Sequence, residues 1–253
     1  MTKKLLLLIC FSTLLFSCSK KENWQIETKT YQLKTSLPCK GDECSYVELN
    51  IPTIISEDEN LKKINQIVFD TVKKHIAFET NDAEIKTYDE LAKSFIASYD
   101  DIKRAFPNEP LPWEASVDAT SETFENKSVN IVLEYFTYTG GAHGNEGTVS
   151  LFFNLKNGKL ITQKDLFLDY EGFKKIAERD FRTSVNLSQE DNINKNGNLF
   201  KNKQFSLPQN IIITQNEIIL HYNKYEIAPY SSGAMILKFP MKTFKNFLNP
   251  LYF

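Results

Sequence analysis

The most unusual run of residues in the chain is a glycine-rich segment with one histidine, Thr139-Gly140-Gly141-Ala142-His143-Gly144-Asn145. Glycine reaches backbone conformations that other residues avoid, and it lets another group approach the main chain closely. The run lacks the glycine spacing of a phosphate-binding loop, and it leads into a predicted strand instead of a helix. We therefore expect either a tight connection between strands, with His143 as a hydrogen-bonding clasp, or a surface on which His143 contacts a partner.

A second unusual run, residues 222–233, is rich in tyrosine. It contains Tyr225, Glu226, Pro229 and Tyr230 and ends in glycine. Amphipathic rings of this kind are enriched where proteins recognise partners. The alternative is a packed connection between strands, in which the tyrosines cover the end of a sheet.

The sequence offers little for catalysis or metal binding. Its three histidines, His75, His143 and His221, do not have the spacing of a helical metal site, and no G-x-S-x-G elbow is present. We therefore predict no catalytic residue, no metal and no cofactor. Two carboxylates acting on a glycan would meet only in the folded chain, so an enzyme that uses Glu226 in acid–base chemistry on cell-wall glycan is the alternative.

Residues 1–17 have the pattern of an export signal, with two lysines before an apolar run that ends at Phe16. That run is shorter than the roughly 20 residues needed to span a bilayer. Leu15-Phe16-Ser17-Cys18 resembles the bacterial lipobox, which implies cleavage before Cys18 and acylation of its sulfur. We predict a signal peptide over residues 1–17, a lipidated tether over 18–23, and a place in the bacterial cell envelope, on the periplasmic side or at the cell surface.

The cysteines that would remain unmodified are Cys39 and Cys44. An exported chain is found where disulfides persist. The spacing is longer than a redox C-x-x-C, and no further metal ligands lie nearby. We predict a structural disulfide that closes a reversal between two strands.

Hydrophobic spacing predicts the elements that carry these residues. Alternation indicates strands over 24–36 and 46–55, and three- and four-residue spacing indicates two helices, from residue 56 to about 78 and from 87 to 106. Each helix begins with a predicted capping box, Ser56 with Glu59 and Thr87 with Glu90. Their arrangement is a hairpin followed by two amphipathic helices.

Beyond the proline-rich passage at residues 107–112 the pattern changes to alternation, which places a domain boundary there. Strands are predicted at 113–119, 129–138 and 149–155, as an antiparallel meander. A helix over about 173–185, a polar segment at 188–208 expected to be a mobile loop, three short strands and a terminal helix follow. Helices grouped with antiparallel strands indicate the α+β class, an antiparallel sheet with packed helices in two subdomains.

Length and charge narrow the class of partner. The chain has 253 residues, of which 42% are hydrophobic, enough for one large core or two small ones. Its formal net charge is −2, without a concentrated basic cluster, which argues against nucleic acid as a partner. Cleavage before Cys18 would remove two of the 30 basic residues and leave 28 against 32 acidic ones.

The glycine-rich run together with Tyr225-Glu226-Ile227-Ala228-Pro229-Tyr230 and Gly233 resembles the envelope domain shared by RsiV-type anti-sigma factors and PdaC-type peptidoglycan deacetylases. The resemblance covers residues 110–253, and residues 24–109 resemble the PdaC-like companion domain that precedes it. In RsiV-type proteins the pair of domains is an extracytoplasmic receptor that binds lysozyme. PdaC-type proteins append a separate deacetylase domain, for which residues 24–253 leave no room.

The resemblance thus implies a stand-alone binding module. We expect a non-enzymatic envelope lipoprotein that is held at the membrane by its lipid anchor and that recognises lysozyme or a peptidoglycan-related ligand. The predicted ligand-binding residues are Gly140, Gly141, His143, Gly144, Tyr225, Glu226, Pro229 and Tyr230. A purely structural role in envelope assembly is a third possibility.

Overall fold

The computed structural model of the chain describes residues 24–39, 43–78, 84–108 and 111–253. The predicted signal peptide (1–17), the tether (18–23) with Cys18, and the tip of the cysteine reversal lie outside these residues. In the part of the chain that the structure describes, no helix is both long and apolar enough to cross a membrane.

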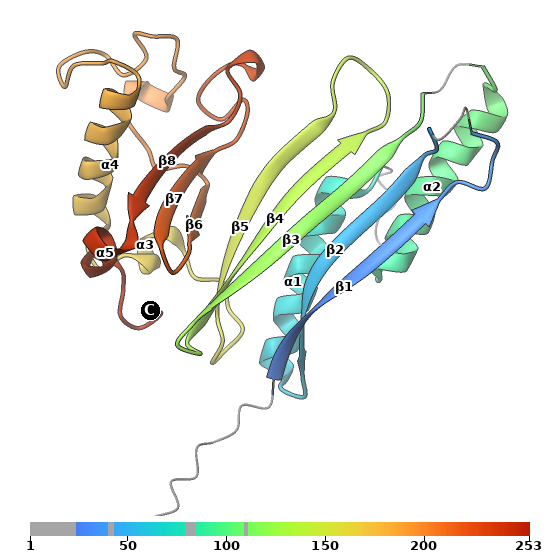
Figure 1. Ribbon diagram of the computed structural model, residues 1–253, viewed down its shortest axis with the longest axis horizontal. Coiled ribbons are helices and arrows are strands. Elements are labelled where there is room, and N and C mark those ends of the chain that lie inside the picture. Colours follow the sequence, from blue (N-terminus) through green and yellow to red (C-terminus); the bar gives the residue numbers. More distant parts are fainter. Residues whose placement is uncertain (1–23, 40–42, 79–83, 109–110) are drawn as a thin grey trace, which may run out of the picture.

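The larger of two sheets has five strands in the order β1-β2-β3-β4-β5 (Figure 1). Its strands are β1 (Trp24–Lys34), β2 (Tyr46–Ser56), β3 (Glu114–Phe124), β4 (Ser128–Tyr138) and β5 (Asn145–Asn154). The predicted hairpin and the predicted meander are confirmed, since β1 pairs with β2, β3 with β4 and β4 with β5 in antiparallel fashion. The exception is β2 and β3, which are parallel, because the chain crosses between them through two helices.

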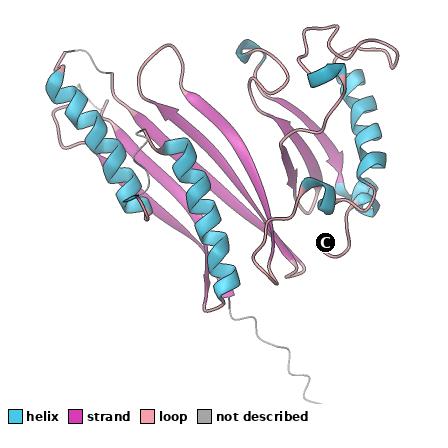
Figure 2. Ribbon diagram, turned by 180° about the vertical axis from the view of Figure 1, so that it is seen from behind, coloured by secondary structure: helices cyan, strands magenta, loops and turns pink. Residues whose placement is uncertain are grey.

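The two crossover helices, α1 (Glu59–Ile76) and α2 (Tyr88–Ala105), cover one face of this sheet (Figure 2). The capping box of α2 is confirmed, with the Thr87 and Glu90 side chains bonded reciprocally to backbone N–H groups. The capping box predicted for α1 is wrong. Strand β2 continues to Ser56, and α1 is instead capped by Asp58, whose carboxylate accepts the N–H of Asn60 at 2.7 Å.

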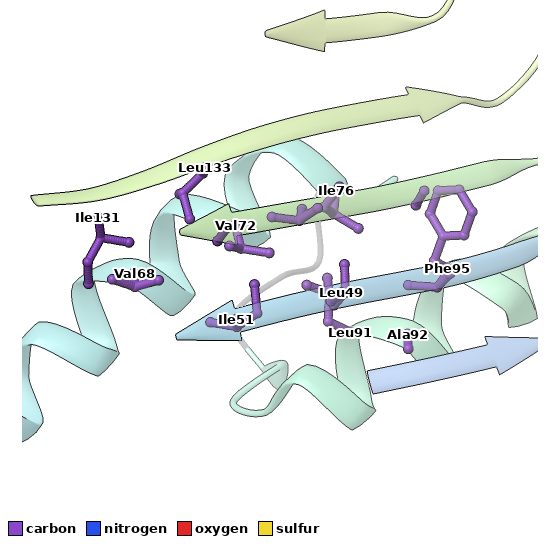
Figure 3. Close-up of a cluster of buried hydrophobic side chains, with 14 of the residues drawn as sticks. Leu49, Ile51, Val68, Val72, Ile76, Leu91, Ala92, Phe95, Ile131 and Leu133 are labelled. Atoms are coloured by element: carbon purple, nitrogen blue, oxygen red, sulfur yellow. The ribbon is translucent and has the colours of Figure 1, made fainter. Parts of the chain in front are cut away.

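The core of this unit is the layer between the helices and the sheet (Figure 3). Inward side chains of alternate strand residues meet the apolar stripes of the helices, as Leu49, Ile131, Ile64 and Phe95 illustrate, each at most 1% exposed. Strands on both sides of residues 107–112 contribute to this core, since Val47 and Leu49 lie in it with Ala115 and Val117. The proline-rich passage therefore connects helix α2 to strand β3 within this one unit.

The second unit is a three-stranded antiparallel sheet with the helix α4 (Tyr170–Ser184) along one side and shorter helices near its lower end (Figure 1). Its other elements are α3 (Gln163–Leu166), β6 (Asn210–Ile213), β7 (Glu217–Tyr222), β8 (Met235–Pro240) and α5 (Met241–Phe244), with 3₁₀ turns η2 (Lys201–Lys203), η3 (Tyr230–Ser232) and η4 (Lys245–Phe247). Phenylalanine rings dominate its separate core, with Phe173 and Phe239 5.3 Å apart between ring centroids. The fold is α+β, as predicted.

The polar segment at residues 188–208 is irregular, as predicted, but it is packed onto this core. Its Phe200 and Phe205 are buried, and their ring centroids lie 5.1 and 5.7 Å from that of Phe181. The guanidinium of Arg182 donates to the carbonyls of Ser188 and Asp191 and holds the start of the segment. Buried rings and backbone acceptors thus fix the path of a segment whose composition is polar.

The predicted disulfide is present. The sulfurs of Cys39 and Cys44 are 2.01 Å apart, and the Cα atoms are 5.1 Å apart. Next to it, the N–H of Thr35 donates to the carbonyl of Ser45 at 3.0 Å, which continues the β1–β2 pairing toward the bond. The disulfide therefore closes the end of the sheet at which β1 finishes and β2 begins.

Candidate functional site

The two runs singled out in the sequence meet in space, at the upper end of both sheets in Figure 1. The glycine-rich run is the loop between β4 and β5, and the tyrosine-rich run connects β7 to β8. The ring centroids of His143 and Tyr230 lie 4.9 Å apart, and those of Tyr230 and Tyr225 lie 5.4 Å apart. We call His143, Tyr225 and Tyr230 the aromatic cluster.

The glycines of the β4–β5 loop are required by its backbone and its packing. Gly140 and Gly141 have φ values of +102° and +95°, which a side chain would strain. A Cβ at Gly144 would lie 2.4 Å from the ring of Phe136. The Tyr138 hydroxyl also donates to the carbonyl of Gly141 at 3.1 Å. The loop thus has a defined path that leaves His143 exposed beside Tyr230.

Tyr225 occupies an unusual backbone conformation at the tip of the second run. Its φ is +67°, and 70% of the residue is exposed. A bulky residue in the left-handed region persists only where its surroundings impose that conformation. Such residues are concentrated at functional sites, which marks Tyr225 as a candidate contact residue.

Glu226 imposes the conformation of this turn. One of its carboxylate oxygens accepts the N–H of Gln209 at 2.7 Å, and the other accepts the N–H of Asn223 at 2.9 Å. Burial raises the pKa of Glu226, and the two backbone N–H groups oppose that rise. Each carboxylate oxygen thus accepts one backbone N–H, and Glu226 holds the loop in its observed path.

Pro229 lies directly before the η3 turn that presents Tyr230. The residue is exposed, and its carbonyl accepts the N–H of Ser232 at 3.0 Å. Gly233 follows η3 with a φ of +72° and returns the chain to β8. The proline and this glycine therefore fix where Tyr230 stands relative to His143.

Lys224 connects the aromatic cluster to the larger sheet. Its ammonium nitrogen lies 4.3 Å from the centroid of the Tyr230 ring, and it forms an ion pair with Glu146 of β5. A cation over an aromatic face and beside a carboxylate is held by both groups. The two units are further joined next to this point, since the Asn223 side chain accepts the Thr148 N–H at 2.9 Å and donates to its carbonyl at 2.8 Å.

Below the aromatic cluster lies a groove of about 720 Å³ between the two sheets. One wall is the helix-free face of the larger sheet, and the other is formed by β7 and its connection to β8. The polar side chains that line it are Glu48, Asn50, Ser116, Asp118, Glu134, Glu146, Thr148, His221, Asn223 and Lys224. Four carboxylates thus face one lysine, and we call this cavity the acidic groove.

Two of the carboxylates in the acidic groove are direct neighbours. Asp118 on β3 and Glu134 on β4 are paired residues in the antiparallel register, so their side chains leave the same face of the sheet. His221 stands on the opposite wall, where burial lowers its pKa and the charge of Glu134 partly opposes that effect. The groove therefore carries excess negative charge near neutral pH.

The sequence indicated the aromatic cluster but not the acidic groove. Glu48, Asp118 and Glu134 stand at polar positions of predicted strands, where alternation indicates only a solvent-facing side. Their proximity depends on which strands are neighbours, and the parallel pairing of β2 with β3 brings Glu48 beside the meander. A run of carboxylates on the polar faces of three strands was the available signal.

These two surfaces present groups that can contact a ligand. Within the described ranges, no group of three or more His, Cys, Asp or Glu side chains has the geometry to hold a metal ion. The aromatic cluster offers exposed rings, and the acidic groove offers carboxylates, amides and hydroxyls. The two surfaces are continuous, because Lys224 contacts Tyr230 of the aromatic cluster and Glu146 of the acidic groove.

Two family models match the chain, one in the unit with the five-stranded sheet and one in the unit with the three-stranded sheet. Residues 39–146 match the family model "Deacetylase PdaC", and residues 164–242 match "Protein of unknown function (DUF3298)". The predicted resemblance is thereby confirmed. The glycine-rich loop falls in the first matched segment and the tyrosine-rich run in the second, so the aromatic cluster forms where the two segments touch.

Solved structures share the fold over nearly the whole chain. A DUF3298 family protein from Pseudomonas aeruginosa PAO1 is 21% identical with a TM-score of 0.60, and the match covers 92% of this chain and 97% of that one. A DUF3298 family member from Bacteroides fragilis NCTC 9343 is 15% identical with a TM-score of 0.61, and the match covers 89% and 94% of the two chains. No curated protein matches the sequence.

Proposed function

We propose that this chain, which joins a PdaC-like segment to a DUF3298 segment, is a non-enzymatic binding protein held at the bacterial envelope by a lipid on Cys18. It recognises its partner with the aromatic cluster and the glycine-rich loop beside it. The observation that carries the proposal is the contact between His143 and Tyr230, which assembles one exposed surface from two distant runs.

The composition of this surface supports a role in recognition. Tyrosine is enriched among the residues that contribute most to protein interfaces, and the exposed ring of Tyr225 has a neighbour ring in Tyr230 to hold it. The loop around the rings is fixed by Glu226 and by the glycines, so little conformational freedom is lost on binding. A preorganised surface of this kind is suited to protein recognition.

The position of the surface supports display from a membrane tether. Strand β1 begins at Trp24, at the end of the sheet opposite Lys34, and the strand register places Lys34 with Tyr46, Glu114 and Tyr138. At about 3.3 Å per residue, a strand of this length separates the two ends by roughly 33 Å. A tether that enters at Trp24 would therefore present the glycine-rich loop away from the lipid.

Lysozyme is the first partner to test. The resemblance to RsiV-type receptors suggests it, and the acidic groove beside the aromatic cluster would favour encounter with a basic protein. A peptidoglycan fragment is the alternative ligand of the same surface. The use of Glu226 by the backbone supports a binding role over acid–base catalysis.

The test is capture of residues 24–253 on immobilised lysozyme. We expect the intact protein to be retained, and His143→Ala and Tyr230→Ala to reduce retention about tenfold or more. The matched control is Leu251→Ala, which removes a side chain from a residue that is 72% exposed next to the β3–β4 end of the sheet. No retention of the intact protein would exclude lysozyme, and equal loss in the control would exclude the aromatic cluster as the contact surface.

A further inference from the structure

The acidic groove is a second candidate binding surface, next to the aromatic cluster. It has a volume of about 720 Å³, large enough for several side chains of a partner. The helices α1 and α2 cover only the opposite face of the larger sheet (Figure 2). The groove is therefore open to a ligand while the sheet beneath it is rigidly packed.

The arrangement of charge in the groove is unfavourable for the protein alone. Asp118 and Glu134 lie opposite each other on neighbouring strands, where like charges destabilise a sheet. Within the described residues, neither carboxylate forms a salt bridge or a hydrogen bond, and the group that faces Glu134 is His221, whose pKa is lowered by burial. A like-charge pair that costs stability and has no lysine or arginine bound to it points to a role in binding.

The chain itself shows which chemistry the groove accepts. The ammonium of Lys224 is seated at its upper end, between the carboxylate of Glu146 and the face of Tyr230. This is a cation site formed by a carboxylate and an aromatic ring, and it is filled from within. The neighbouring carboxylates of Asp118 and Glu134 extend the same environment, and no lysine or arginine among the described residues forms an ion pair with them.

We propose that the acidic groove binds basic side chains of the protein partner, with Asp118 and Glu134 as the groups that receive an arginine or lysine. The inference rests on the proposed function, and it names the chemistry of the partner surface that would lie next to the aromatic cluster. An extended basic segment of the partner would place one cation on Asp118 and Glu134, and the adjacent residues of that segment would lie along Lys224 and the aromatic cluster.

The test uses residues 24–253 and an acetylated tetra-arginine peptide, with tetra-glutamate as the negative probe. We expect saturable binding of tetra-arginine at low salt that weakens as salt is raised. The double variant Asp118→Asn/Glu134→Gln should raise the Kd about tenfold or more. The control Glu27→Gln/Glu190→Gln changes net charge equally at exposed positions outside the groove and should leave the Kd within about twofold.

A third variant tests whether the site that Lys224 occupies can accept a cation from outside the chain. Lys224→Met frees the carboxylate of Glu146, so we expect tetra-arginine to bind more tightly. NMR amide shifts on titration should cluster on β3 and β4 around Asp118 and Glu134. Equal loss of affinity in the two double variants, or shifts spread over the surface, would overturn the proposal in favour of non-specific charge attraction.

The outcomes separate this proposal from the proposed function. Loss of lysozyme capture in Tyr230→Ala, with an unchanged Kd for tetra-arginine in the groove variant, would retain the aromatic cluster and reject the groove. Groove-dependent peptide binding without lysozyme capture would retain the groove and reject lysozyme as the partner.

Discussion

Removing the like-charge pair in the acidic groove should make the protein more stable. Asp118 and Glu134 are directly opposite each other on β3 and β4. Replacement of either by its amide, Asp118→Asn or Glu134→Gln, keeps the shape and removes the repulsion. Cross-strand pairs contribute about 0.2–1 kcal/mol, so each variant should gain up to about 1 kcal/mol. For a chain of this size that corresponds to a rise in Tm of up to roughly 2–4 °C.

The pair also predicts a specific pattern in a double-mutant cycle. One neutralisation already removes the repulsion, so the double variant should gain less than the sum of the single variants. The gain should shrink in 1 M salt, where the screening length falls to about 3 Å. The assay is urea unfolding of the four proteins at low and high salt, followed by tryptophan fluorescence.

The result that would refute this reasoning is loss of stability in both single variants at low salt. It would mean that the carboxylates make favourable contacts in the folded chain. Additive gains that persist at high salt would also contradict a repulsion between the two residues, because independent local effects would then explain them.

Three further predictions concern the rest of the fold. Gly144→Ala should destabilise the protein by about 1–3 kcal/mol in urea unfolding, because its Cβ would meet the β4 ring below it; an unchanged midpoint would contradict that packing. Cys39→Ser should cost about 2 kcal/mol, the value for so short a closed loop, and reducing agent should then have no further effect. Burial lowers the pKa values of His75 and His221. As pH falls through 6.5, these two groups therefore bind more protons in the unfolded chain than in the folded one, so the free energy of unfolding should fall below pH 6.5 and not above it. Melting curves from pH 8 to 5 should show a smaller acid loss in His75→Gln and His221→Gln, and an unchanged loss would exclude these groups as the cause.

Much of the fold could be predicted because the local signals were strong. The apolar stripe of α2 and its capping box at Thr87 and Glu90 agree with the structure, as do the alternating faces of β3 and β4. The capping box at Ser56 was wrong, since side-chain types alone do not fix where a strand ends. Local patterns also said nothing of the parallel pairing of β2 with β3, which depends on how two helices pack across the sheet.

The irregular segment at residues 188–208 shows a second limit of composition. Its polar residues suggested mobility, yet Phe200 and Phe205 are buried against Phe181. Two phenylalanines among many polar residues produce no hydrophobic periodicity, so the sequence does not reveal that Phe200 and Phe205 are part of the core. The hydrogen bonds from Arg182 to backbone carbonyls likewise depend on the folded path of the chain.

In the candidate site, too, local sequence features could be predicted and tertiary contacts could not. His143, Tyr225 and Tyr230 were predicted because their runs are unusual in themselves, and the structure brings all three together. Glu226 was predicted as a ligand contact, and the structure adds a second role, since its carboxylate accepts two backbone N–H groups. The partners of a buried carboxylate are set by tertiary contacts, so its task could not be read from its neighbours in sequence.

The most direct test of the central claim is photo-crosslinking in cells that express the full-length chain. A photo-reactive amino acid replaces Tyr225 in the aromatic cluster and, as a control, Leu251 next to the β3–β4 end. We predict a discrete crosslinked partner from position 225 that is absent from position 251. The same products from both positions, or none from position 225, would contradict recognition by the aromatic cluster.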